Sequence, residues 1–390
     1  MKNALTEELM VKLSSAAKDR QRISGFTHNF YRYPARFSPQ FAATAIECFS
    51  KPGDLVLDPY MGGGTTIVEA LARGRRAVGN DLNSLAAFIA KVKITHLDLR
   101  ESNAVRKWAA QVVPDLSYRI PRNVITEFLD SDKTRNLSLV RGKFIKKVLA
   151  GAIASVLQLP TRDAQEFARC AMLCVAQWAL DGRKTHTSLS KFRQRLSETV
   201  VQMLVSLDEL SGAMNNEGSV KSCVLTNEDA TSIDCLPIFA KKGERVRLVV
   251  TSPPYPGIHM LYHRWQVDGR RETPAPYWIA GCADGQGASF YNFGDRRQAD
   301  ARSYFATSLR TLKAIRRVMA PGGVIVQMVA FSDPHSQLPR YLNNMEQAEF
   351  SELSVGSARI WRDVPSRRWH ANLKGNLPSS REVVLIHQAV

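Results

Sequence analysis

The sequence predicts a doubly wound α/β sheet that carries an inserted helical subdomain. Short apolar runs that end in acidic or polar residues indicate the sheet, and a glycine-rich turn after the first run indicates a ligand crevice. A long stretch with helical periodicity at residues 99–218 indicates the insertion, since it is longer than a crossover between two strands requires. The 390 residues are enough to build both parts.

The first apolar run predicts a strand and the turn that follows it. Residues 55–57 fit a strand buried on both faces, which ends at Asp58-Pro59 because proline cannot continue the ladder. Gly62 to Gly64 have no Cβ atoms, so their backbone N–H groups can approach a ligand closely. Thr65 or Thr66 is expected to cap the helix that comes next.

Later strand ends bring further polar residues to the same edge. Residues 76–79 predict a strand that leads to Asp81, roughly 20 residues after the turn, the interval at which a carboxylate meets the hydroxyl pair of a ribose. Asp229 and Ser252 follow two later strands, and the carboxyl ends of parallel strands meet at one crevice. The elements expected here and beyond are strands 222–225 and 245–250, a helix at 302–319, a turn at 321–323, and strands 324–330 and 382–388.

The chain before the first strand is predicted to be mainly helical. Residues 1–24 fit a polar amphipathic helix that is only loosely attached, and Ser38 with Pro39 opens a helix that packs beside the first strand. The loop at 32–37 offers aromatic and positive side chains to a cofactor's carboxylate or ring. Phe37 fits equally well a staple that holds this loop on the core.

The insertion is rich in basic helix faces. Helices are expected at 144–157, 163–180 and 190–214. Two positive clusters lie on them: Arg141, Lys143, Lys146 and Lys147 form the first, and Arg183, Lys184, Lys191, Arg193 and Arg195 form the second. Contact with phosphates is favoured over a merely solvated face. The insertion at 99–218 is therefore expected to help bind DNA or read a target.

Composition narrows the choice of partner and compartment. Lys and Arg outnumber Asp and Glu by 53 to 36, and the net charge of +17 makes nucleic acid the first partner to consider. The six cysteines lie far apart, which argues against a disulfide frame or a zinc site and for a reduced, intracellular protein with no metal. No uncharged run approaches the length of a membrane span, so a cytoplasmic location is expected.

Two motifs resemble those of a known family. D-P-Y-M-G-G-G-T-T at 58–66 and T-S-P-P-Y at 251–255 resemble the S-adenosylmethionine-dependent amino-methyltransferases of DNA, and Y-P-A-R-F at 33–37 is similar to their N-terminal cofactor motif. The Ser-Pro-Pro-Tyr form is similar to the cytosine-N4 members, whereas adenine-N6 members more often have Asp-Pro-Pro-Tyr. The turn has Gly-Gly-Gly where members often have Gly-Ser-Gly.

The resemblance implies a Rossmann-like methyltransferase fold with S-adenosylmethionine as the cofactor. It implies a catalytic domain at 25–98 and 219–390, with the insertion at 99–218. Together with the crevice argument it gives these candidate cofactor-binding residues: Tyr33, Arg36, Phe37, Asp58, Pro59, Gly62, Gly64, Thr65, Thr66, Asp81, Asp229 and Thr251. The candidate catalytic residues are Ser252, Pro253, Pro254 and Tyr255.

The T-S-P-P-Y residues suit the methylation of an exocyclic amine, which is a poor nucleophile because its lone pair is delocalised into the ring. Ser252 Oγ and the Pro253 carbonyl can hold the amine hydrogens out of plane, so that the lone pair faces a sulfonium methyl group. Tyr255 offers a face on which an extruded base stacks. Methylation of a cytosine carbon would require a cysteine nucleophile, usually after proline, and the chain has no Pro-Cys pair.

The expected product is N4-methylcytosine in double-stranded DNA. An adenine-N6 DNA methyltransferase, an RNA amino-methyltransferase and a non-catalytic nucleic-acid-binding module stay open as alternatives. A cognate restriction endonuclease is a possible partner, and DNA would associate the protein with the nucleoid. The sequence gives neither the recognition site nor the oligomeric state.

Overall fold

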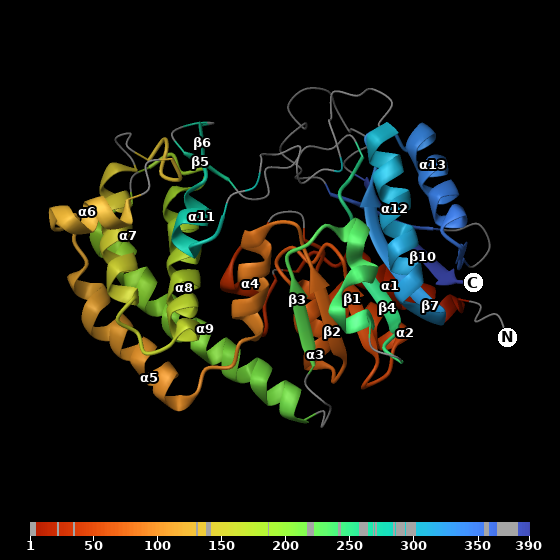
Figure 1. Cartoon of the computed structure of the whole chain (residues 1–390), viewed down its shortest axis with the longest axis horizontal. Helices are drawn as coiled ribbons and strands as arrows, with labels where there is room; N and C mark the ends of the chain where they lie inside the picture. The colour runs from red at the N-terminus through yellow and green to blue at the C-terminus, as the bar shows by residue number, and fades with distance from the viewer. Residues whose placement is uncertain are drawn as a thin grey trace.

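In the computed structural model, an α/β core lies beside a group of helices (Figure 1). The structure describes residues 5–21, 23–33, 36–129, 132–137, 142–185, 187–216, 222–240, 243–256, 264–267, 269, 271–283, 285, 293, 302–354, 359–364 and 381–390. Residues 1–4, Pro34, Ala35, Arg141, residues 217–221 and most of 257–301 fall outside the described residues, and so do the parts of the predicted segments that they form.

The core is an eight-stranded sheet with the order β3-β2-β1-β4-β7-β10-β8, in which β9 also pairs with β10. The strands β3, β2, β1, β4 and β7 are parallel, and β10 is antiparallel to β7, β8 and β9. Their bounds are β1 Leu55–Asp58, β2 Arg76–Asn80, β3 Cys223–Thr226, β4 Val246–Thr251, β7 Met319–Ala330, β8 Phe350–Glu352, β9 Ile360–Asp363 and β10 Arg381–Ala389. The predicted doubly wound fold is confirmed, and the strand order reverses between β1 and β4, where such sheets bind ligands.

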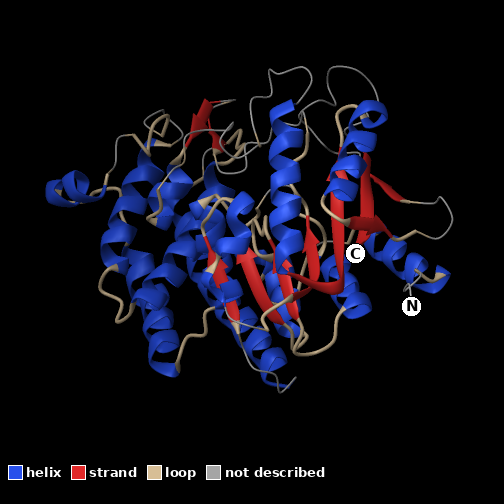
Figure 2. Cartoon of the chain, turned by 45° about the vertical axis from the view of Figure 1, so that its right-hand side comes forward, coloured by secondary structure: helices blue, strands red, loops and turns tan. Residues whose placement is uncertain are grey.

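Helices cover both faces of the sheet because its strands are apolar on both sides (Figure 2). Val56 packs with the helices of one face, and its neighbours Leu55 and Leu57 pack with those of the other, as alternation along a strand requires. The first face carries α1 Glu7–Lys18, α2 Pro39–Phe49, α3 Thr65–Ala72 and α4 Ser84–Ile94. The second carries η4 Ala230–Cys235, α10 Pro237–Ala240, α12 Arg302–Val318 and α13 Pro334–Gln347.

The insertion forms a helical unit whose apolar core continues into η1 His28–Phe30 and α4, since Phe30, Leu85 and Ile89 belong to the same buried cluster. Its elements are α5 Leu99–Lys107, η2 Trp108–Val112, η3 Val113–Asp115, α6 Arg122–Phe128, α7 Lys143–Val156, α8 Arg162–Leu180 and α9 Leu189–Asn216. The strand β5 Trp265–Val267 and the helix α11 Ala275–Ala280 pack on α8, although they follow β4 in the chain, and β6 Arg271–Thr273 pairs with β5 (Figure 1). Near the far end of α9, Leu210 packs on Val68 and Ala72 of α3, so this long helix ties the unit to the sheet.

Two local predictions were wrong. The first helix is not loosely attached, because Leu13 and Ala17 are fully buried and the Ala17 carbonyl accepts a hydrogen bond from Arg362. Residues 321–323 are not a turn between separate elements, because they lie within β7. The pairing of β4 with β7 shifts from Val246–Met319 to Leu248–Val324. Residues 321–323 lie in this irregularity of the strand, between the two pairs.

Within the described part of the chain, no helix is long and apolar enough to cross a membrane. The same residues contain no group of three or more His, Cys, Asp or Glu side chains arranged to hold a metal ion.

Candidate active site

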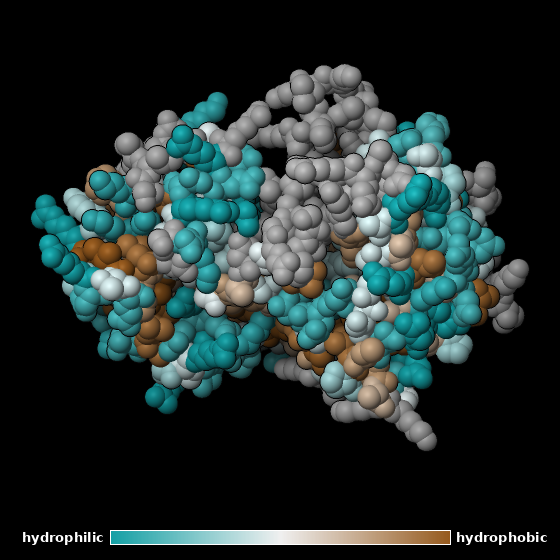
Figure 3. Space-filling model, turned by 45° about the horizontal axis from the view of Figure 1, so that its top comes forward, coloured by the Kyte–Doolittle hydropathy of each residue, from teal (hydrophilic) through white to brown (hydrophobic). Residues whose placement is uncertain are grey.

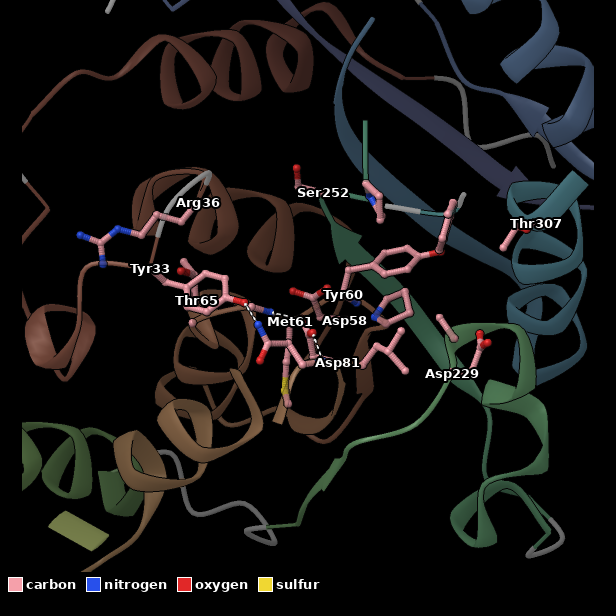
Figure 4. Close-up of a pocket in the computed structure, with 18 of the residues that line it drawn as sticks. Tyr33, Arg36, Asp58, Tyr60, Met61, Thr65, Asp81, Asp229, Ser252 and Thr307 are labelled. Carbon is pink, nitrogen blue, oxygen red and sulfur yellow. Dashed lines mark hydrogen bonds between the residues drawn. The ribbon is translucent and has the colours of Figure 1, made fainter. Parts of the chain in front are cut away.

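A cavity of about 410 Å³ lies at the carboxyl ends of the central strands (Figure 4). Of the sequence-predicted site residues, the structure brings these to its wall: Tyr33, Arg36, Phe37, Asp58, Pro59, Gly62, Thr65, Asp81, Asp229, Ser252 and Pro254. Gly64, Thr66, Thr251, Pro253 and Tyr255 do not line it. Gly63, part of the predicted glycine turn, also lines the cavity. The sequence reasoning missed Tyr60, Met61, Leu82, Asn83, Ala230, Phe293, Ser303, Thr307 and Arg310.

The glycine turn and Asp81 hold each other in place. The backbone N–H of Gly62 donates to Asp81 Oδ2 at 2.8 Å, and the N–H of Asn83 donates to Asp81 Oδ1 at 2.8 Å. Burial raises the pKa of Asp81 to about 6, against the opposing effect of these two bonds. The carboxylate is therefore ionised at neutral pH, and its remaining lone pairs can accept the hydroxyls of a ribose.

Two positions in the turn require glycine. Gly64 has φ of +75° and is the residue before the first turn of α3, so the helix begins from a left-handed residue and receives no side-chain cap. A Cβ atom on Gly63 would lie 2.9 Å from Tyr33 Cβ. The prediction that Thr65 or Thr66 caps this helix was wrong. Thr66 instead donates to the Val250 carbonyl at 3.0 Å and fastens α3 to β4.

Asp58 lies at the centre of the site, between Ser252 and Asp81 (Figure 4). It is 2% exposed and accepts hydrogen bonds from Thr251 Oγ1 at 2.6 Å and from the Tyr60 N–H at 3.1 Å. Burial raises the pKa of Asp58 to about 7, because desolvation outweighs these bonds. Thr251 does not line the cavity, and its hydroxyl contacts Asp58, which does.

Two basic residues lie on the side of the cavity where Tyr33 lies, and Arg36 is the one that reaches the wall. Arg36 lines the wall and donates to the His28 carbonyl at 2.8 Å, and burial lowers the pKa of Arg36 to about 10. Lys93 is fully buried behind the turn and donates to the Gly63 carbonyl at 2.6 Å. Burial lowers the pKa of Lys93 to about 7. This side of the cavity suits an anionic group of a ligand.

The T-S-P-P-Y loop faces the cavity with Ser252 and Pro254. The Tyr304 hydroxyl donates to the Pro254 carbonyl at 2.7 Å, whereas no donor among the described residues contacts the Pro253 carbonyl. Tyr255 is 5% exposed and lies beneath the wall, with its hydroxyl 2.9 Å from Ser252 Oγ. Its expected stacking on a base therefore stays a prediction.

Aromatic rings that the sequence reasoning missed line the cavity beside this loop. Tyr60 and Phe293 meet edge to face with ring centroids 5.5 Å apart, and Phe293 in turn lies 5.7 Å from Tyr304. Asp229 lies near them and accepts the Thr231 N–H at 2.8 Å (Figure 4). Tyr60 stands inside the D-P-Y motif, so its sequence position was the available signal. The sequence of α12 contains no comparable signal, because Ser303, Thr307 and Arg310 reach the cavity only through the packing of α12.

Comparison with known proteins bears on this geometry. A family described as DNA methylase, of N6 and N4 methyltransferases, matches residues 11–91. The type II methyltransferase M.MvaI of Kocuria varians is 32% identical over 146 residues, which cover 35% of this chain and 31% of that protein. M.BsoBI of Geobacillus stearothermophilus is 31% identical over 113 residues, which cover 28% of this chain and 22% of that protein. M.MjaII of Methanocaldococcus jannaschii is 31% identical over 74 residues, which cover 19% of this chain and 14% of that protein.

The matched segment contains the glycine turn and Asp81, the two features that shape one side of the cavity. The chain spans about a third or less of the length of these curated relatives. The match supports S-adenosylmethionine as the cofactor, and the side chains fit it: Asp81 can accept ribose hydroxyls, and Arg36 brings a positive charge to the same cavity wall. The resemblance to the DNA amino-methyltransferases that the motifs predict is thus confirmed for the cofactor-side part of the chain, residues 11–91.

Proposed function

We propose that the chain is a DNA methyltransferase that transfers a methyl group from S-adenosylmethionine to the exocyclic N4 amine of a cytosine turned out of duplex DNA. One observation carries the proposal: Asp81, beside the glycine turn, and Ser252, in the T-S-P-P-Y loop, line the same cavity. Cofactor-side and acceptor-side groups therefore meet within one space, as a direct transfer between two bound molecules requires.

The cofactor side has groups that suit two polar parts of S-adenosylmethionine, the ribose and the carboxylate. Asp81 accepts the ribose hydroxyls, and the positive Arg36 faces the carboxylate of the methionine part. Asp229 offers a further acceptor beside the rings of Tyr60 and Phe293. When bound, the cofactor supplies an electrophilic sulfonium methyl group.

The acceptor side explains how the protein activates an amine. Ser252 Oγ accepts one amine hydrogen at the cavity wall. The family resemblance assigns the other hydrogen to the Pro253 carbonyl, although Pro253 does not line the cavity in this structure, and the two bonds together would draw the nitrogen lone pair out of the ring plane. Two consecutive prolines fix the backbone, and the Tyr304 bond to Pro254 fixes the loop further. The amine proton that transfer makes acidic faces Ser252 Oγ and leaves to solvent along this wall.

The preference for cytosine rests on the size and charge of residue 252. Adenine-N6 relatives usually have Asp at the position of Ser252, and a small neutral hydroxyl leaves room for an amine carried on a single pyrimidine ring to reach deeper. The adenine-N6 reaction is the second candidate, because the same cavity accepts an exocyclic amine of either base. An RNA substrate and a non-catalytic binding role remain the outcomes that the test below distinguishes.

The helical unit is proposed to contact DNA phosphates. Lys143, Lys184 and Lys191 are exposed on it, and hydrophilic side chains cover much of this side in Figure 3. Not every predicted basic residue is available, since Arg193 donates to the Leu116 carbonyl and so fixes η3 against α9. A restriction endonuclease partner and a cytoplasmic, nucleoid-associated location remain predictions.

The test is to incubate the purified protein with S-adenosylmethionine and duplex DNA and to identify the modified nucleosides by mass spectrometry. N4-methylcytosine supports the proposal. N6-methyladenine without N4-methylcytosine would mean that the target base is adenine and not cytosine. Methylation of RNA without methylation of DNA would mean that the substrate is RNA. Cofactor binding without any methylated nucleoside would favour the non-catalytic role.

A further inference from the structure

A chain of hydrogen bonds runs from Ser252 into the sheet behind it. The Ser252 hydroxyl lies 2.9 Å from the Tyr255 hydroxyl and 3.0 Å from the Met328 carbonyl oxygen. Tyr255 donates to Glu382 Oε1 at 3.0 Å, and Arg362 donates to Glu382 Oε2. Tyr255 and Glu382 are only 5% and 2% exposed. A serine at the cavity wall is thus connected to a buried ion pair between β9 and β10.

The ion pair of Glu382 with Arg362 determines which atom donates in each hydrogen bond between Glu382 and Ser252. Glu382 faces the Arg362 guanidinium as a carboxylate, and a carboxylate only accepts hydrogen bonds. Tyr255 has a single hydroxyl proton, which the bond to Glu382 uses, so the Tyr255 oxygen faces Ser252 as an acceptor. The single proton of Ser252 then points to Tyr255 or to the Met328 carbonyl, both behind the cavity wall. In either case Ser252 Oγ presents a lone pair to the cavity.

We propose that Glu382 is a positioning residue for methyl transfer: through Tyr255, it holds the Ser252 hydroxyl as an acceptor that faces the cavity. The inference rests on the proposed function, because a substrate amine is an N–H donor and requires an acceptor at Ser252. Glu382 does not line the cavity, so its effect passes through the Tyr255 hydroxyl. The C-terminal strand thereby contributes to a site whose recognised motifs all lie earlier in the chain.

Glu382→Gln tests this role because it keeps the shape of the side chain and adds an N–H donor. When that donor faces Tyr255, the phenol proton turns to Ser252, so Tyr255 no longer accepts the Ser252 proton. The Met328 carbonyl is then the one acceptor behind the wall among the described residues, and a Ser252 proton that turns to the cavity instead opposes the N–H donors of the amine. We expect kcat for methyl transfer to fall roughly 10-fold, less than the ~100-fold that a 1 Å misplacement of a reacting group can cost, because Ser252 itself stays in place. The KM for DNA and the Kd for S-adenosylmethionine should change by less than about twofold, since ground-state binding is untouched.

A double-mutant cycle separates positioning from general destabilisation. Tyr255→Phe removes the hydroxyl and leaves the ion pair of Glu382 with Arg362 intact, so it should lower kcat to a similar degree even where Glu382→Gln folds poorly. Because the two changes break one path, the double variant should be no slower than Tyr255→Phe alone. Additive losses, or a Glu382→Gln enzyme with the parent kcat, would overturn the inference.

A matched control is the pair of Glu352 with Arg359. Glu352 accepts from Arg359 Nε at 2.6 Å and from Nη2 at 2.8 Å on the neighbouring strand β8, and no hydrogen bond joins this pair to Ser252 among the described residues. Glu352→Gln therefore removes a carboxylate–arginine pair of the same kind, although a more exposed one, and we expect it to leave kcat at the parent value. A loss in Glu352→Gln equal to that in Glu382→Gln would mean that any broken ion pair in this sheet slows the enzyme.

A second readout does not depend on activity. In protein labelled with [ζ-¹³C]tyrosine, the Tyr255 resonance is identified by its loss in Tyr255→Phe. It should shift in Glu382→Gln and in Ser252→Ala, but not in Glu352→Gln. A parent protein that methylates no nucleic acid would contradict the proposed function, whereas an unmoved Tyr255 resonance in Glu382→Gln would overturn the inference itself.

Discussion

Thr251 Oγ1 donates a 2.6 Å hydrogen bond to Asp58 Oδ1, and this bond joins the two motifs of the candidate active site. Asp58 ends β1 and Thr251 ends β4, although 193 positions separate them in the chain. The two strands are adjacent and parallel. Because the glycine turn and the Ser252 loop follow these two residues directly, the bond fixes one motif relative to the other.

Replacing Thr251 by valine should expose the contribution of this bond. Valine keeps the shape of threonine but leaves the buried Asp58 with one donor fewer, so we expect the free energy of unfolding to fall by about 1 to 2 kcal/mol. The pKa of Asp58 should rise further, because hydrogen bonds to a carboxylate favour its ionised form. Thermal and chemical denaturation measure the first effect. Thr251→Ser, which keeps the donor, is the control, and a valine variant as stable as the parent would contradict the role given to the bond.

Removing Asp81 should weaken cofactor binding. Asp81→Ala deletes the acceptor of the ribose hydroxyls and releases the Gly62 N–H, so we expect S-adenosylmethionine to bind about 1 to 3 kcal/mol more weakly by calorimetry. Asp54→Ala, at the opposite end of β1, is the matched control and should bind as the parent does. Equal affinity in the parent and Asp81→Ala would remove Asp81 from the cofactor site.

Cofactor affinity should fall in acid. Burial raises the pKa of Asp81 to about 6, so lowering the pH from 8 to 5 protonates it and removes an acceptor for the ribose. The affinity should therefore drop with an apparent pKa near 6. Asp58, whose pKa is raised to about 7, is present in both proteins, so the difference between the pH profiles of the parent and Asp81→Ala isolates Asp81. Superimposable profiles would show that another group governs the pH dependence.

The helical unit supplies a test of DNA contact. Replacing Lys143, Lys146 and Lys147 of α7 with glutamine should weaken binding uniformly across DNA sequences and flatten the salt dependence by up to about one unit of slope per lost contact. Removing the same charge from Lys12, Lys18 and Lys51 of the sheet domain is the control. If both triple variants have the parent's slope, the α7 lysines form a solvated face.

The strand ends and the glycine turn could be predicted because their signals are local. An apolar run followed by Asp58 and Pro59 fixes where β1 ends, and both Asp81 and Ser252 could be assigned to the crevice because parallel strands share one edge. The resemblance to DNA amino-methyltransferases rested on the same short segments and is confirmed over residues 11–91.

The features that the sequence did not reveal depend on distant packing. The burial of α1 involves Arg362, which lies 345 positions beyond Ala17. The attachment of α11 to the helical unit depends on a tertiary contact with α8, which no local periodicity encodes. The cap of α3 was mistaken because threonine favours that position in general, whereas here Gly64 takes a left-handed conformation.

Ser252→Ala tests the acceptor side alone. Alanine removes the hydroxyl that accepts an amine hydrogen, so the rate of methyl transfer should fall roughly 10- to 1000-fold, the scale of one lost transition-state hydrogen bond. Cofactor binding should stay near the parent value, because Ser252 bonds only to Tyr255 and Met328 among the described residues. Single-turnover kinetics and calorimetry measure the two quantities, and a variant with the parent's transfer rate would exclude Ser252 from the chemistry.

The identity of the methylated nucleoside tests the central claim most directly. Duplex DNA containing all sequence contexts is incubated with the purified protein and S-adenosylmethionine, digested to nucleosides and analysed by mass spectrometry, with Ser252→Ala as the control. The account predicts N4-methylcytosine in the parent reaction and a strongly reduced amount with the variant. N6-methyladenine without N4-methylcytosine, or no methylated nucleoside from a protein that binds the cofactor, would contradict it.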